Sequence, residues 1–193
     1  MKNLFTIPET KPLGKDSIMA LAFHEAGHAV IHFAFGIPFL QASIIKNEIQ
    51  RSLGRVTRFI EPTNPDFVED WLMEHNPALF DKWTFEVNNS YWYCGCMSGV
   101  IAQKMYTGAE DWEGAGHDME VMLEHQPDGS LDETLPLNEA LQPYADKTFK
   151  LLTANLSLLK KVAADLYESK ELGKSYFDAI AQSEAVTSFF SLP

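Results

Sequence analysis

The sequence has little positive charge and few cysteines. Its 193 residues include 15 Lys and Arg against 27 Asp and Glu, which gives a formal net charge of −12. Because this excess of negative charge repels phosphate backbones and anionic lipid headgroups, we expect no nucleic-acid partner. The two cysteines, Cys94 and Cys96, are too few for a disulfide framework. We therefore expect buried free thiols and a reducing, cytoplasmic location.

The sequence also lacks a long uncharged apolar run. Its most apolar stretch, residues 18–40, contains His24, Glu25 and His28, and such ionisable side chains exclude a lipid-facing helix. Residues 1–15 lack the apolar segment of a signal peptide. We therefore expect no membrane insertion and no signal peptide.

What the sequence does contain is typical of a globular protein. Hydrophobic residues make up 46% of the chain and charged residues 22%, a balance that predicts a folded domain with its own core. We expect an N-terminal arm over residues 1–15, a single domain over residues 16–185, and a C-terminal tail over residues 186–193.

The apolar pattern predicts a mostly α-helical domain with a small β-sheet, an α+β fold. The longest apolar segment predicts a buried helix over residues 17–35, capped by Asp16 or Ser17 and ended by Gly36. Two β-prone runs within residues 40–60 predict a pair of strands. Further helices are expected over residues 66–75, 86–106, 117–125, 141–171 with a break near Asn155, and 175–182.

The most informative string is His24-Glu25-Ala26-Gly27-His28. On a helix, residues four apart share a face, so both imidazoles can bind one metal ion. A Zn²⁺ ion bound there would lower the pKa of a water molecule and polarise a carbonyl group. Glu25 would accept the proton of that water and return it to the leaving amine. The string therefore predicts a zinc site, although the ligand types alone do not exclude Fe²⁺ or Co²⁺.

A catalytic zinc ion needs a third protein ligand and an open position. His32 lies one turn beyond His28, but three successive turns hardly converge on one ion, so we expect it to pack in the core. Among the acidic side chains, Asp118 has the strongest local case, because it follows a Gly-Ala-Gly turn and opens a short helix. The spacing leaves several acidic candidates open: Glu110, Asp111, Glu113, Asp118, Glu120 and Glu124.

Several segments, in the same order, resemble the peptidase domain of the FtsH family, the membrane-anchored ATP-dependent zinc metalloproteases. The resemblance extends over about residues 18–180 and implies a helical zincin-like fold. The pairing of HEAGH with a later Gly-Ala-x-x-Asp is its most specific part. The similar segments are HEAGHAV at 24–30, GIP at 36–38, ASII at 42–45, LGRV at 53–56, SGVIA at 98–102 and GAGHDM at 114–119.

By this resemblance, His24, His28 and Asp118 bind Zn²⁺ and Glu25 is the general base. The implied activity is that of a zinc metalloendopeptidase that hydrolyses peptide bonds. An extended peptide substrate would add as a further strand to an exposed sheet edge, where main-chain pairing reads little sequence. The implied substrate-binding residues are Leu53, Gly54, Arg55 and Val56.

The sequence departs from the family pattern in ways that affect the expected partners. No segment resembles the ATPase module or the membrane anchor, so we expect peptides, unfolded protein segments or one specific partner as substrates. Members of the FtsH family assemble as hexamers, so a homo-oligomer of this chain stays an open alternative. Gln103 replaces an acidic residue of the family, and His117 replaces an Asn beside the third ligand. Two alternatives therefore stay open: a non-catalytic zinc-stabilised module that binds a protein partner, and a zinc hydrolase of non-peptide amides.

Overall fold

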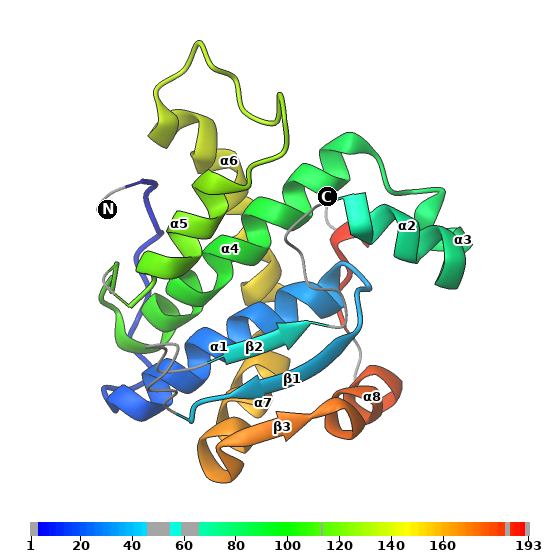
Figure 1. The fold of residues 1–193 in the computed structure, drawn as a ribbon. Coiled ribbons are helices and arrows are strands. Elements are labelled where there is room, and N and C mark those ends of the chain that lie inside the picture. The colour runs from blue at the N-terminus through cyan, green and yellow to red at the C-terminus, as the bar shows by residue number, and fades with distance from the viewer. Residues whose placement is uncertain (1–3, 46–54, 59–65, 113, 184–185, 192–193) are drawn as a thin grey trace.

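The computed structural model describes residues 4–45, 55–58, 66–112, 114–183 and 186–191, and this part of the chain is mostly helical with a small sheet (Figure 1). This confirms the predicted mostly α-helical class. None of the described helices is long and apolar enough to cross a membrane. The elements are α1 (Ser17–Ala34), β1 (Phe39–Ser43), β2 (Arg55–Arg58), α2 (Asp66–His75), α3 (Pro77–Phe80), α4 (Phe85–Thr107), α5 (Gly116–Glu124), α6 (Leu137–Ala154), α7 (Leu156–Ser169), β3 (Glu171–Gly173), α8 (Lys174–Ser183) and the 3-10 turn η1 (Phe189–Ser191).

The central element is α1, which other elements surround on most sides. Its start is set by Asp16, whose carboxylate accepts a hydrogen bond from the backbone N–H of Met19 at 2.8 Å. Its end is set by Gly36, which adopts the left-handed conformation at φ 76°. Packing against α4, α6, α7 and β1 buries nearly every residue of the helix after its first turn. The predicted helix and both of its boundaries are therefore confirmed.

Helix α4 lies directly against α1, and two glycines allow the close approach. A Cβ atom at Gly27 would lie 2.6 Å from the carbonyl oxygen of Ser98, which is closer than packed atoms can come. A Cβ atom at Gly99 would run into the imidazole ring of His24. Glycine at these two positions therefore brings the backbone of α4 close to the histidine face of α1.

The sheet has three antiparallel strands in the order β2-β1-β3. Strands β1 and β2 form the predicted pair, with Ala42 opposite Val56. Strand β3 was not predicted, because its three residues lie between two helices and pair only through β1. Both β1 and β2 contact α1, so the sheet lies beside the central helix (Figure 1).

The C-terminal helices differ from the prediction mainly at their boundaries. The predicted break near Asn155 is confirmed, since this residue separates α6 from α7. Helix α6 begins at Leu137 rather than at residue 141, because Pro136 precedes it and a polar sequence can form an exposed first turn. The short helix α3 was not predicted, since a single turn leaves no apolar period in the sequence.

The segments at both ends of the described chain pack onto the domain. Phe5 and Ile7 of the N-terminal arm are buried, and the carbonyl oxygen of Ile7 accepts a hydrogen bond from Lys104 Nζ at 2.7 Å. In the C-terminal tail, the ring of Phe189 stacks on Phe35 with 4.3 Å between centroids. The arm and the tail thus both contribute apolar contacts to the domain core.

Candidate metal centre

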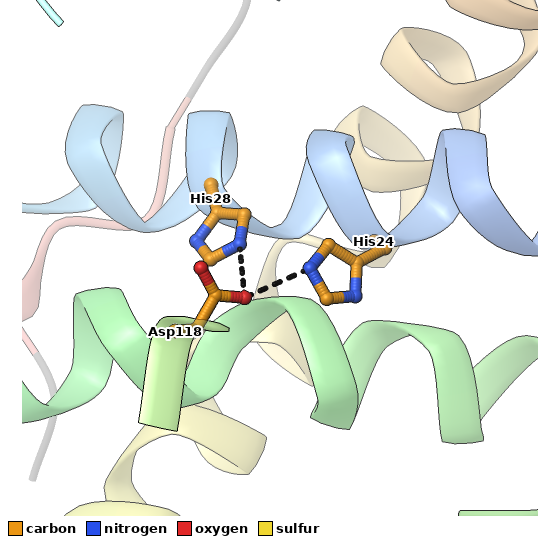
Figure 2. Close-up of side chains that lie close together, drawn as sticks. All are labelled: His24, His28 and Asp118. Carbon is orange, nitrogen blue, oxygen red and sulfur yellow. Dashed lines mark hydrogen bonds and ion pairs between the residues drawn. The ribbon is translucent and has the colours of Figure 1, made fainter. Parts of the chain in front are cut away.

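Two histidines of α1 and one aspartate of α5 converge on a single point (Figure 2). The Oδ2 atom of Asp118 lies 3.0 Å from Nε2 of His24 and 3.3 Å from Nε2 of His28. One ligand atom from each of the three residues lies within 4.8 Å of the other two. Residues 94 positions apart in the sequence therefore present two imidazole nitrogens and a carboxylate oxygen to the same small volume.

The position of Asp118 on α5, and the burial of other residues of that helix, hold Asp118 in this place. Asp118 lies in the first turn of α5, where the N-terminal end of the helix favours a negative charge. The fully buried Met119 and Met122 attach the same helix to the core. The side chain of Asp118 keeps 27% of its surface exposed, whereas the His24 side chain keeps 8%. The site is thus open to solvent on the aspartate side.

The backbone of α4 fixes the ring of His28. Its Nδ1 atom lies 2.9 Å from the carbonyl oxygen of Gly95 and 3.0 Å from Oγ of Ser98. The Ser98 hydroxyl in turn donates to the Gly95 carbonyl at 2.7 Å. Because a carbonyl oxygen only accepts, Nδ1 of His28 carries a proton, so Nε2 is the nitrogen that would bind a metal ion after losing its own proton.

The ring of His24 has a side-chain partner on the opposite nitrogen. Its Nδ1 atom lies 3.2 Å from Oε1 of Gln103, and Nε2 of Gln103 donates to Oδ2 of Asp111 at 2.9 Å. Gln103 belongs to the last turns of α4, and Asp111 belongs to the loop before α5. A metal-binding histidine commonly has such a partner on its second nitrogen.

Electrostatic interactions couple the three candidate ligands. Burial lowers the pKa of His24, but the hydrogen bond and the charge of Asp118 outweigh this effect and raise it to about 9. Burial also favours the neutral form of Asp118, but the charges and hydrogen bonds of both histidines hold its pKa well below the usual range. In the absence of a metal, the carboxylate is therefore ionised and paired with imidazolium.

Glu25 is buried beside these residues, with 5% of its surface exposed. Burial raises the pKa of its carboxyl group, the charges of His24 and His28 oppose this, and the charge of Asp118 adds to it. Among the described residues, Glu25 has neither a hydrogen bond nor an ion pair. A buried carboxylate of this kind is costly unless a cation or a proton accompanies it.

The donor set fits a divalent zinc ion. Zn²⁺ binds imidazole nitrogen and carboxylate oxygen, and ligand atoms around one such ion lie roughly 3–4 Å apart. The three candidate ligands provide these atom types at about this spacing, and a cation between them would offset the negative charges of Asp118 and Glu25. Two protein imidazoles and one carboxylate also leave a fourth position free, as a catalytic site requires.

The remaining acidic candidates for the third ligand lie elsewhere or have other partners. Glu110 pairs with Lys104 at 3.0 Å, and Asp111 accepts from Gln103. Glu120 and Glu124 are exposed on α5, and Glu113 lies outside the described residues. Only the group of His24, His28 and Asp118 meets metal-ligand spacing within the described part of the chain.

The other residues singled out in the sequence have structural surroundings. His32 is buried, and its Nδ1 atom lies 3.0 Å from the hydroxyl of Tyr91, as expected for a core residue. His117 is exposed at the start of α5. Cys94 and Cys96 are buried free thiols, as predicted, and burial raises the pKa of the Cys94 thiol to about 11.

The predicted substrate strand is described in part. Leu53 and Gly54 lie outside the described residues, whereas Arg55 and Val56 belong to β2. In the described sheet, β2 is an edge strand that pairs with β1 on one side. The role of these residues in binding a peptide stays a prediction.

Family models and curated sequences give no relative of this chain. No protein-family model matches the chain, and no curated protein matches its sequence. The geometry of the site and the motifs of the sequence are therefore the basis for assigning a function.

Proposed function

We propose that this protein is a zinc-dependent metallopeptidase that hydrolyses peptide bonds in peptides or unfolded protein segments. The observation that supports this best is the convergence of both His-Glu-x-x-His histidines with Asp118, at 3.0 and 3.3 Å from one carboxylate oxygen. The resemblance of the sequence motifs to the FtsH peptidase domain supports the same ligand set. Two histidines and two carboxylates in one largely buried region are costly unless they are paired or bind a cation, and a bound metal ion would offset this cost.

His24, His28 and Asp118 would hold the metal ion, and Glu25 would act as the general base. A bound Zn²⁺ ion supplies a Lewis acid that acidifies a water molecule and polarises the scissile carbonyl. In the metal-free chain burial raises the pKa of the Glu25 carboxyl group, and a carboxylate of raised pKa is a stronger proton acceptor once it is ionised. Glu25 takes the proton from the attacking water and then gives it to the nitrogen of the leaving amine.

The edge strand supports a peptide over a small amide as the substrate. Strand β2 lies beside α1, which carries two of the proposed ligands and the general base. An extended chain can pair with the open side of an edge strand through main-chain hydrogen bonds. A small amide would gain nothing from such an edge, whereas an unfolded segment of almost any sequence could use it.

The activity is tested with a fluorescently labelled unfolded protein and a mixed peptide library. Glu25→Gln removes the base but keeps the size of the side chain, so we expect hydrolysis to fall by a factor of 10² or more, on the order of general-base contributions. The matched control is Glu120→Gln, since Glu120 is an exposed Glu on α5 and should leave the rate unchanged. Equal rates for wild type and Glu25→Gln would contradict the proposed mechanism.

Two further outcomes would favour the alternatives. A wild-type protein that binds zinc and cleaves neither substrate would favour a non-catalytic module that binds a protein partner. Cleavage of small amides without cleavage of peptides would favour an amide hydrolase. Either result would overturn the peptidase proposal.

A further inference from the structure

We propose that Gln103 and Asp111 together form a positioning pair that fixes His24 for metal binding. This inference deepens the proposed function and rests on its metal site, but it does not require that the site be catalytic. Neither residue belongs to the proposed ligand set. Both act through the side of the His24 ring that faces away from Asp118.

Asp111 determines the direction of the hydrogen bonds that connect it, through Gln103, to His24. The Asp111 carboxylate, when ionised, can only accept hydrogen bonds, so the partner atom of Gln103 at 2.9 Å must be its NH₂ group. The carbonyl oxygen of the Gln103 amide therefore faces His24, at 3.2 Å from Nδ1. Since that oxygen also only accepts, Nδ1 of His24 must donate. The Nε2 atom is then the nitrogen left to bind a metal.

Hydrogen bonds hold the Asp111 carboxylate in place, so that it can position the side chain of Gln103. Its second oxygen, Oδ1, accepts the backbone N–H of Gly114 at 2.9 Å. A Cβ atom at Gly114 would lie 2.9 Å from Oδ2, so glycine gives the carboxylate its room. Next to it, Glu110 bonds to Lys104 Nζ and to the indole of Trp112. The loop that carries Asp111 is therefore attached to α4 through Glu110 as well as through the Gln103 contact.

This arrangement explains why an amide stands at position 103 rather than the acidic residue of the FtsH pattern. A carboxylate there would face the Asp111 carboxylate at about hydrogen-bond distance, and like charges that close repel. An amide can donate to Asp111 and accept from His24 at the same time. The same loop leads into α5, so the contact also ties the partner of His24 to the helix that carries Asp118.

The test measures zinc affinity of the full chain by competition with a chromophoric chelator at one pH. Gln103→Met removes both hydrogen bonds at nearly constant side-chain volume, and we expect zinc binding to weaken by about 10–100-fold. Asp111→Asn should weaken zinc binding less. The amide that replaces the carboxylate can still form a hydrogen bond with Gln103, but it no longer requires Gln103 to be the donor. The double variant Gln103→Glu with Asp111→Asn exchanges the two groups. Its new carboxylate at position 103 can accept from His24 and from the new amide at position 111, so most of the wild-type affinity should return.

The matched control is Glu124→Gln, which neutralises an exposed carboxylate of α5, the helix that follows the same loop. It should keep wild-type zinc affinity, and unfolding of each metal-free variant by urea shows whether it is folded. Wild-type affinity in Gln103→Met, failure of the exchange to restore binding, or an equal loss in Glu124→Gln would each overturn the positioning role. A wild-type chain without zinc affinity would overturn both this inference and the proposed function. Zinc-binding variants that behave as expected, in a chain without peptidase activity, would overturn the proposed function alone.

Discussion

The contact between Gly99 and His24 allows a sharp test of how helix packing builds the site. Gly99→Ala adds one methyl group to α4 where the imidazole ring of His24 now lies. The ring cannot simply swing aside, because Asp118 and Gln103 hold its two nitrogens. The substitution should therefore displace His24 from Asp118 and weaken zinc binding as well as folding.

The magnitude follows from a matched substitution four residues earlier. Gly95 lies on the same helix, and a Cβ atom there would meet nothing within 4 Å. Replacing glycine by alanine inside a helix gains about 0.5–1 kcal/mol. Forcing a methyl group into packed space costs about 1–3 kcal/mol. Gly95→Ala should then stabilise the chain slightly, and Gly99→Ala, which has the same gain but adds the packing cost, should be about 1–3 kcal/mol less stable than Gly95→Ala.

The assay is urea unfolding of both metal-free variants, followed by zinc titration of each. We expect Gly95→Ala to unfold at a higher urea concentration than wild type and to bind zinc normally. Gly99→Ala should unfold at a lower concentration and bind zinc more weakly. If the two variants have the same midpoint and the same zinc affinity, then α4 does not press on His24 and the packing argument is wrong.

Three other predictions concern charge, metal and the C-terminal tail. The pKa of His24 is raised from 6.5 to about 9 in the folded chain, so protonated His24 stabilises the fold fully below about pH 6.5, and this stabilisation is lost as the pH rises through 9. The unfolding free energy of the metal-free chain should therefore fall between these pH values. This dependence on pH should be weaker in His24→Gln. Added zinc should raise the thermal midpoint of wild type in proportion to the logarithm of its concentration, and this rise should be absent in Asp118→Ala. Asn155→Ala removes the hydrogen bonds to both backbone groups of Thr187, so it should lower the unfolding free energy by about 1–3 kcal/mol and speed proteolytic removal of the tail.

Local chemistry made much of the fold predictable. The boundaries of α1 follow from Asp16 and Gly36, and the end of α4 follows from Gly108, which has a φ of 74°. Each of these residues acts on backbone groups within a few positions of itself. Strand β3 could not be found in this way, because three residues form a strand only when a distant partner such as β1 supplies the hydrogen bonds.

The candidate site was likewise predictable only in part. The spacing of His24 and His28 on one helix was enough to predict that they share a face, and the resemblance to FtsH supplied Asp118. The pairing of Gln103 with Asp111 gave no signal, because Gln103 lies one turn before the end of α4 and Asp111 lies in the following loop, whose path the sequence does not specify. The role of Gly99 was equally hidden, since it depends on how closely α4 approaches α1.

The metal content per chain shows whether His24, His28 and Asp118 bind one metal ion. Purified wild type supplied with zinc should hold about one equivalent by elemental analysis, as three protein ligands predict. Glu25→Gln should hold the same amount, whereas His24→Ala and Asp118→Ala should lose it. A wild-type chain that retains no zinc after it is supplied, or an Asp118→Ala variant that keeps full occupancy, would show that these three residues do not form the metal site.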